Sequence, residues 1–334
     1  MSGGWNTIES DAGVFTFLLN NLGAKDVQFE ELLTLEPETL AALHPVYGVI
    51  FLFRYPTDAP YAAADKPLDG TFDHEASERI FFAAQTIQNA CGTQALLSVL
   101  LNKDEQSSGG GSNDGTGIDI GQPLREFREF TMMLPPEFRG ETLSNSELIR
   151  DVHNSFAKSS PFVDETQRTG NEETEDAFHF IAYTPVNGTL YELDGLQPAP
   201  ISHGACTQGE FPAKVMEVLQ RRIARYDMSE IRFNLMAMVR DLRVRAREIG
   251  DEEALRREEM KRRDWQYENA LRRHNFVGFA AKVLEGVVKK KLDEGGDAAY
   301  GKWVEDAKGR TRARLEGKRK GGGGGGGDDV EMAG

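Results

Sequence analysis

The sequence predicts an α/β fold that is followed by a helical C-terminal extension. Strand-like and helix-like runs alternate over the first 239 residues, whereas charged helix-forming residues dominate from Arg240 onward. A chain of 334 residues that is 39% hydrophobic can bury one large core and carry a second module. We therefore expect a domain over residues 1–239, a helical extension over residues 240–313 and a disordered Gly-rich tail over residues 314–334.

Local signals mark the first elements of this domain. The stretch "ESDAGVFTFLLNNLG" predicts an amphipathic helix that Ser10 or Asp11 caps and that Gly23 ends. The run Tyr47–Tyr55 is short, apolar and rich in aromatic and β-branched residues, so it predicts a buried strand.

The clearest strand signal lies in "AFHFIAYTPVNGTLYELDGL", where two β-rich runs flank Asn187-Gly188. This dipeptide favours the type I′ turn of a two-residue hairpin. An amphipathic helix from about Ala213 to Tyr226 and a strand over "EIRFNLMAMV" are expected next, and a helix break is expected near Gly250.

Two polar segments are predicted to be loops. Residues 105–121 are rich in glycine and serine and are expected to form a flexible surface insertion. The stretch "SSPFVDETQRTGNEETEDA", residues 159–177, is polar, acidic and without periodicity, and loops of this length within a domain are usually functional or disordered.

The cysteine content limits the class of protein. Cys91 and Cys206 form neither a disulfide framework nor a zinc-binding spacing, so we expect a reduced, intracellular protein without metal or cofactor. The N-terminal stretch "MSGGWNTIESDAG" lacks the basic and apolar parts of a signal peptide, and no run approaches 18 apolar residues. Secretion and membrane insertion are therefore not expected.

Cys91 is either a small buried packing residue or a nucleophile. It lies in "QTIQNACGTQALLS", just before or at the start of a predicted helix. Unpaired N–H groups and the positive end of the helix dipole stabilise a thiolate there, and a histidine partner would stabilise it further.

His179 is the histidine that lies within a strong strand signal. If Asn187-Gly188 forms the turn, the residue numbers of two paired positions add up to 375. Ile181 is then paired with Asp194. Because side chains alternate along a strand, His179 shares a face with Ile181 and lies diagonal to Asp194. The two side chains can meet there, although an exposed polar pair is the alternative interpretation.

Acyl transfer also needs donors for the oxyanion. Gln85 could supply its amide, six positions before Cys91, but Gln88, Asn89 and Gln94 are further candidates that composition does not separate.

These motifs resemble the ubiquitin C-terminal hydrolases, a family of papain-like cysteine proteases. The likeness rests on "FFAAQTIQNACGTQALLSVLLN", "DAFHFIAYTPVNGTLYELDGL" and "GWNTIESDAGVFTFLLNNLG", and it covers about residues 4–239. It implies a papain-like fold with a mostly antiparallel central sheet flanked by helices. It further implies Cys91 as nucleophile, His179 as general base and acid, Asp194 as its orienting group and Gln85 as the oxyanion donor.

The implied activity is hydrolysis of the bond after the C-terminal glycine of ubiquitin, through an acyl-enzyme intermediate. Ubiquitin and its conjugates are the expected partners, and the net charge of −18 over residues 1–240 suits a basic partner. Two alternatives stay open, namely a ubiquitin-binding proteasome scaffold with little turnover and a general thiol protease. The resemblance also implies that the loop over residues 155–175 crosses the active site and limits the size of the leaving group.

The extension resembles that of the long, proteasome-associated members of the family, in the segment "WQYENALRRHNFVGFAAKVLEGVVKKK". This implies docking on a ubiquitin receptor of the proteasome regulatory particle, and packing of the helix on its own domain is the alternative. The basic run Lys308–Lys320 fits a nuclear signal, a nucleic-acid contact or a solvated tail, of which the tail is the simplest. A cytoplasmic and nuclear location is therefore expected, without nucleic acid or membrane as a partner.

Overall fold

The computed structural model describes residues 4–54, 66–106, 117–156, 178–226, 230 and 232–321. The chain divides into two compact units, of which the first reaches His274 and the second begins, in its main part, at Asn275. Among the described residues no helix is both long enough and apolar enough to cross a membrane.

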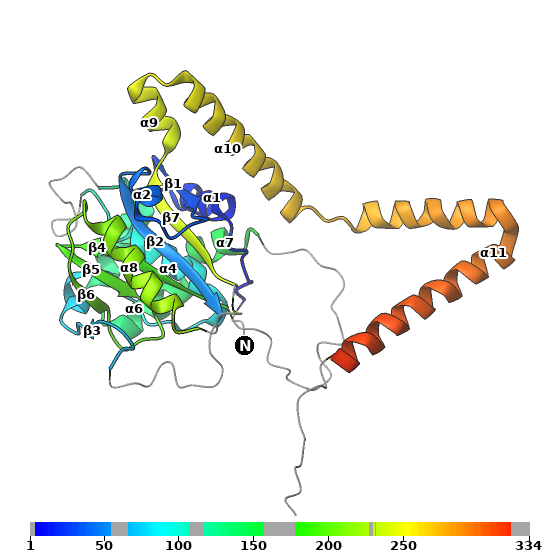
Figure 1. Cartoon of the computed structure of the whole chain (residues 1–334), viewed down its shortest axis with the longest axis horizontal. Coiled ribbons are helices and arrows are strands. Elements are labelled where there is room, and N and C mark those ends of the chain that lie inside the picture. The colour runs from blue at the N-terminus through cyan, green and yellow to red at the C-terminus, as the bar shows by residue number, and fades with distance from the viewer. Residues whose placement is uncertain are drawn as a thin grey trace, which may run out of the picture. The chain divides into compact units, whose positions relative to one another are not determined.

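A seven-stranded antiparallel sheet forms the centre of the first unit, with strand order β1-β7-β2-β4-β5-β6-β3 (Figure 1). This confirms the expected fold class. The strands are β1 (Val27–Glu31), β2 (Val46–Arg54), β3 (Thr71–Phe72), β4 (Phe178–Val186), β5 (Thr189–Leu193), β6 (Ile201–Ala205) and β7 (Asn234–Arg240).

Helices cover both faces of the sheet. They are α1 (Ala12–Leu22), α2 (Pro37–Ala41), α3 (Ala76–Arg79), α4 (Cys91–Leu100), α5 (Gln122–Met132), α6 (Pro136–Asn145), α7 (Glu147–Asn154), α8 (Phe211–Ile223), α9 (Leu242–Ile249) and α10 (Glu252–Arg273), with a short 3₁₀ turn, η1 (Gln88–Ala90), before α4. A larger core lies on the face covered by α1 and α4, and a smaller one lies under α2 and α8.

Alternation along the central strands separates the two cores. Ile50 of β2 and Ala182 of β4 point into the larger core, whereas Phe51 and Ile181 point into the smaller one. Strands buried on both faces read as continuous apolar runs, which is why these segments were recognisable in the sequence.

The predicted caps of α1 are confirmed. The carboxylate of Asp11 accepts a hydrogen bond from the Val14 backbone N–H at 2.9 Å, and Gly23 ends the helix with φ 101°. Gly250 likewise ends α9 in the left-handed conformation, with φ 73°.

The predicted surface insertion at residues 105–121 is wrong at its C-terminal end. Ile118 and Ile120 are buried in the larger core, and Ile118 bridges Asp104. Alternating isoleucines in "GIDIG" fit a half-buried extended segment, which the surrounding glycines obscured. Residues 107–116 lie outside the described residues, as do residues 157–177, which hold most of the predicted acidic loop.

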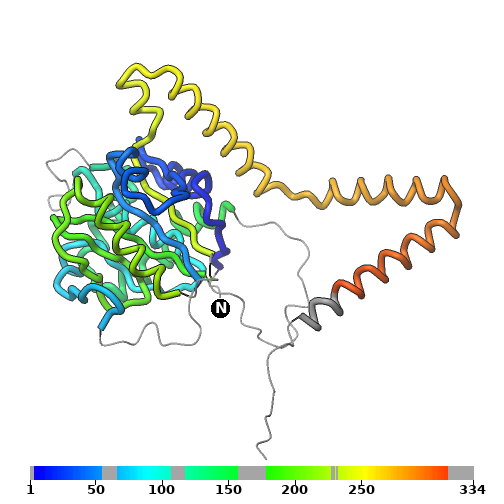
Figure 2. The backbone as a smooth tube through the Cα atoms, in the orientation of Figure 1, coloured from blue at the N-terminus to red at the C-terminus, as the bar shows by residue number. Residues whose placement is uncertain are grey.

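The extension contributes to both units. Helices α9 and α10 belong to the first unit, where the Asn269 side chain donates a hydrogen bond to the Gly13 carbonyl of α1 at 3.1 Å. The second unit consists mainly of α11 (Val277–Gly321), which is interrupted at Gly295 and Gly296 (Figure 2). The boundary expected at residue 240 from the change in composition stays a prediction.

Candidate active site

Cys91 is the first residue of α4, and the whole of α4 is buried within the first unit. The 3₁₀ turn η1 leads directly into it, so Cys91 stands in the first helical turn, whose backbone N–H groups have no partner within the helix. The thiol therefore lies at the positive end of the α4 dipole. Cys91 is 8% exposed and belongs to the larger core.

The hairpin brings His179 and Asp194 together as its register predicts. Both turn residues have positive φ, 51° at Asn187 and 77° at Gly188. Ala182 pairs with Leu193, and because these residue numbers add up to 375, the predicted register is confirmed. Asp194 follows β5 directly, and its Oδ1 lies 2.7 Å from His179 Nε2. The diagonal contact is therefore real, and both side chains are buried rather than exposed.

Cys91 lies within hydrogen-bonding reach of the imidazole, and this interaction is one of those that raise the pKa of His179. Since Nε2 faces Asp194, Nδ1 is the ring nitrogen that remains for the thiol. Oδ1 of Asp194 also accepts the backbone N–H of Leu196 at 3.0 Å, which fixes the carboxylate. The structure thus joins the three predicted residues in one hydrogen-bonded line.

The electrostatics favour a charged histidine. Burial by itself lowers the pKa of His179, but the charge of Asp194 and the hydrogen bonds to Asp194 and Cys91 outweigh it and raise the pKa to about 9. Burial would raise the pKa of Asp194, yet the His179 charge and hydrogen bond hold it below its usual range. An imidazolium can therefore persist at neutral pH beside the thiol.

The structure narrows the choice among the four amides. Gln94 donates to the Ala83 carbonyl at 2.6 Å, and Asn89 donates to the Trp5 carbonyl at 3.1 Å, so both support the fold. Gln88 is exposed. Gln85 is half-buried in the segment before η1, where its backbone N–H donates to the Gly195 carbonyl at 2.8 Å and its side-chain amide makes a longer bond of 3.4 Å to the Gln88 carbonyl. The assignment of Gln85 as the oxyanion donor stays a prediction.

Sequence reasoning did not include Gly195. A side chain there would place its Cβ 2.1 Å from Nε2 of Gln94 and 3.0 Å from Cβ of Gln85. The glycine lets the chain after Asp194 pass close to the segment that carries Gln85. Its position directly after the predicted acid was the available signal.

Phe53 of β2 was also not recognised. It pairs with His179 across the sheet, and the two rings meet edge to face with centroids 5.7 Å apart. Within the described part of the chain, no cluster of histidine, cysteine and acidic residues has the arrangement of a metal site.

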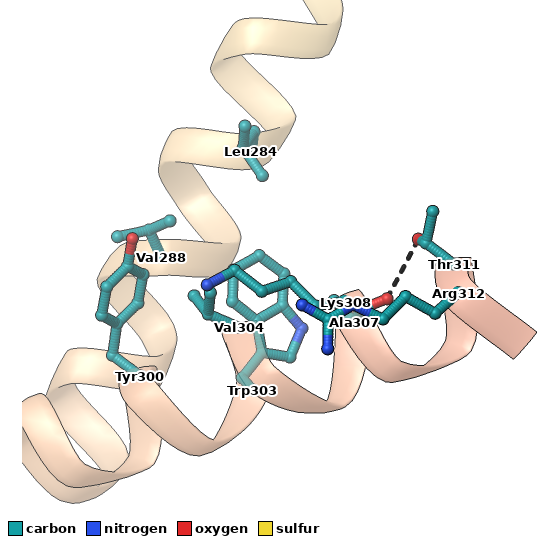
Figure 3. Close-up of a pocket in the computed structure, with 9 residues that line it drawn as sticks. All are labelled: Leu284, Val288, Tyr300, Trp303, Val304, Ala307, Lys308, Thr311 and Arg312. Carbon is teal, nitrogen blue, oxygen red and sulfur yellow. Dashed lines mark hydrogen bonds between the residues drawn. The ribbon is translucent and has the colours of Figure 1, made fainter.

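A separate groove lies in the second unit, between the two parts of α11 (Figure 3). It has a volume of about 510 Å³, and its walls include Leu284, Val288, Tyr300, Trp303 and Val304. The rings of Tyr300 and Trp303 lie 6.2 Å apart. Lys308 and Arg312 also line it, so the groove combines apolar and basic side chains.

A thiol at a helix N-terminus, hydrogen-bonded to a histidine that a buried aspartate orients, defines a cysteine hydrolase on an α/β fold. The family model "Ubiquitin carboxyl-terminal hydrolase, family 1" matches residues 5–224, and the model "Ubiquitin carboxyl-terminal hydrolases" matches residues 250–292. The chain belongs to the ubiquitin carboxyl-terminal hydrolase family and is a deubiquitinating cysteine hydrolase.

Several relatives match over nearly their whole length. Ubiquitin carboxyl-terminal hydrolase 2 of Schizosaccharomyces pombe is 49% identical over 87% of this chain and 93% of its own. Ubiquitin carboxyl-terminal hydrolase ubh-4 of Caenorhabditis elegans is 35% identical over 96% of this chain and 99% of its own. The crystal structure of Trichinella spiralis UCH37 bound to ubiquitin vinyl methyl ester has a TM-score of 0.58 at 33% identity, covering 80% of this chain and 99% of that one.

Gly195→Ala should impair the site without unfolding the protein. The added methyl group must displace Gln94 or Gln85, and a misplacement of about 1 Å can cost about 100-fold in rate. We expect kcat/KM for ubiquitin carrying a C-terminal fluorophore to fall roughly 10- to 100-fold. Gly209→Ala is the matched control, since no atom lies within 4 Å of its added Cβ. Equal rates for both variants would contradict this account of Gly195.

The raised pKa of His179 predicts a pH-dependent stability. The folded state holds a proton that the unfolded chain releases near pH 6.5, so this stabilisation is complete below pH 6.5 and is lost as the pH rises through about 9. Urea unfolding at pH 6, 8 and 9.5 should show this decline, and His179→Gln should make it shallower. The same slope in both proteins would show that His179 is not charged in the fold.

Proposed function

We propose that this hydrolase cleaves the bond after the C-terminal glycine of ubiquitin through an acyl-enzyme intermediate. The observation that carries the proposal is the hydrogen-bonded line from Cys91 through His179 to Asp194. Its two ends suit this role, since the thiol lies at a helix N-terminus and the carboxylate is buried.

In the first half of the reaction, the Cys91 thiolate attacks the carbonyl carbon and forms a C–S bond. The carbonyl oxygen gains negative charge, which the Cys91 backbone N–H and the Gln85 amide would stabilise. When the intermediate collapses, the C–N bond breaks and the His179 imidazolium gives its proton to the leaving amine.

In the second half, neutral His179 accepts a proton from water, and the resulting hydroxide attacks the thioester. The C–S bond then breaks and releases the Cys91 thiolate beside the protonated His179, which restores the thiolate–imidazolium pair. The new carboxylic acid of ubiquitin loses its proton to solvent and leaves as the carboxylate. Asp194 holds the ring in position throughout, because Nε2 stays hydrogen-bonded to Oδ1.

Ubiquitin recognition is supported by charge and by likeness. The net charge of −18 over residues 1–240 suits a basic partner, and the Trichinella structure holds a ubiquitin derivative. A scaffold without turnover would have no chemical use for the buried His179–Asp194 pair, so the enzymatic reading is favoured over that alternative.

Cys91→Ala should abolish this hydrolysis while leaving the fold and ubiquitin binding largely intact. The protein also offers a matched control in Cys206, which is buried and whose thiol donates to the Thr207 carbonyl instead of a histidine. Ubiquitin with a C-terminal electrophile should form a covalent adduct with the wild-type protein and with Cys206→Ala, but not with Cys91→Ala. Mass spectrometry locates the adduct, and labelling of Cys206 in the wild-type chain would refute the mechanism.

We further propose that the groove of the second unit docks on a ubiquitin receptor of the proteasome regulatory particle, and that the protein works in the cytoplasm and nucleus. The proposal follows from the resemblance of the extension to that of long family members. It is supported by the family match over residues 250–292 and by the exposed apolar lining around Trp303. Exposed apolar grooves on a small helical unit are typical of protein-binding sites.

Trp303→Ala should weaken this docking because buried tryptophans commonly dominate binding energy. We expect at least a roughly tenfold loss of affinity for purified regulatory particles, with unchanged hydrolysis of the small fluorogenic substrate. Tyr267→Ala serves as the control, since Tyr267 is 67% exposed on α10 of the first unit. Wild-type affinity after the Trp303 change would place the docking surface elsewhere.

A further inference from the structure

A second buried ionic cluster lies within the first unit, in addition to the His179–Asp194 pair. Arg222 of α8 lies with its Nη1 2.6 Å from Oε1 of Glu192 on β5. The other carboxylate oxygen of Glu192 lies 3.1 Å from Nε2 of His203 on β6. Arg222 is 7% exposed and Glu192 is 3% exposed, so this is a buried ion pair.

Stability alone does not explain why this ion pair is buried. Burying two charges costs several kcal/mol each, and apolar residues of similar volume often stabilise a fold equally well. The cluster takes no direct part in the proposed chemistry. Its position next to the reacting groups is therefore the informative feature.

Two routes connect this pair to His179. The first is a stack of side chains, since the Arg222 guanidinium lies 4.6 Å from the centre of the Phe53 ring, and that ring meets His179 edge to face. Phe53 is fully buried, and it pairs with His179 in the sheet. A shift of the guanidinium would thus be transmitted to the imidazole.

The second route is electrostatic and runs through Asp194, two residues after Glu192. Oδ2 of Asp194 is buried and has no hydrogen-bond partner within the described residues. Burial raises the pKa of Asp194, and the charge of Arg222 is one of the influences, after His179, that lower it. The charge of Asp194 in turn raises the pKa of Glu192, which burial also raises, while Arg222 and His203 lower it overall.

The geometry points to Arg222 and Glu192 as positioning residues, which orient His179 through Phe53 and set how tightly it holds its proton. This inference deepens the proposed function, because it concerns the residue that would act as general acid and base. Arg222 contacts the Phe53 ring and also supplies a positive charge near Asp194. Glu192 compensates this positive charge, which would otherwise act on Asp194.

The charged and titratable groups around the two pairs come from every neighbouring element. Cys91 of α4 and Asp194 after β5 face His179. The Arg222–Glu192 pair is faced by Tyr183 of β4, His203 of β6 and Tyr226 after α8. Burial holds the pKa of Tyr183 well above 10 and also raises the pKa of Tyr226, so both phenols are uncharged at neutral pH.

The decisive variant is Glu192→Gln in the full chain. It leaves the Arg222 cation uncompensated beside Asp194, so the imidazolium of His179 is stabilised less. We expect the pKa of His179 to fall by roughly 0.5–1 unit, as for charges a few side chains apart at an effective dielectric constant of about 20. The double variant Glu192→Gln/Arg222→Met removes both charges and should restore the wild-type value.

The measurement is an NMR titration with ¹³C-labelled histidine. The chain has six histidines, and the signal that disappears in His179→Gln identifies the relevant one. The alkaline limb of kcat/KM for ubiquitin-fluorophore hydrolysis should move with the NMR value, because the imidazolium is the proposed acid. An NMR shift without a matching kinetic shift would support the inference and refute the proposed function.

Arg222→Lys tests the contact with the Phe53 ring separately from the positive charge at position 222. It also provides the test of the inference if Glu192→Gln fails to fold. Lysine keeps the positive charge for Glu192 but presents no plane to Phe53. We expect an almost unchanged pKa of His179 with a severalfold lower kcat and an unaltered KM. An unmoved pKa in folded Glu192→Gln, or an undiminished kcat in Arg222→Lys, would overturn the inference.

Discussion

The two-residue turn at Asn187-Gly188 is the constraint on which the active site depends. Its positive φ angles suit asparagine and glycine, and they fix the register of β4 against β5. A slip of one residue would turn the His179 side chain to the opposite face of the sheet and break its contact with Asp194. β4 also pairs with β2 in the middle of the sheet, where Phe53 lies opposite His179. A local turn thus determines a contact between residues that are 15 positions apart.

Much of this could be predicted because the determining signals are local. The caps of α1, the hairpin and the start of α4 each depend on neighbouring residues. The contact between His179 and Asp194 could therefore be predicted by counting residues on either side of the turn. The positions of Phe53 and Arg222 could not be derived in this way. In "QRRIARY" the adjacent arginines look equivalent, yet Arg221 lies at the surface whereas Arg222 is buried against Glu192. Only the packing of α8 on the sheet separates them.

Helix α10 shows the same limit on a larger scale. Its composition is charged on all sides, a pattern that usually indicates a solvated helix. A few specific contacts hold it instead, including a buried ion pair between Arg262 and Asp241 at 3.0 Å. The Trp265 ring lies so close to Gly13 that a methyl group there would approach it to 2.7 Å. The extension therefore begins as part of the catalytic unit, and only the residues after His274 form a separate module.

The buried acids of the first unit differ in what their partners can do. Glu192 and Asp241 each face an arginine, which keeps its charge at any accessible pH, and Glu192 is also hydrogen-bonded to His203. Asp194 instead faces a histidine, whose charge can change during a reaction. A fixed ion pair beside a variable one gives the fold a way to adjust the proton affinity of His179 without altering any atom that reacts. The burial of Arg222 is then a property of the active site as much as of the core.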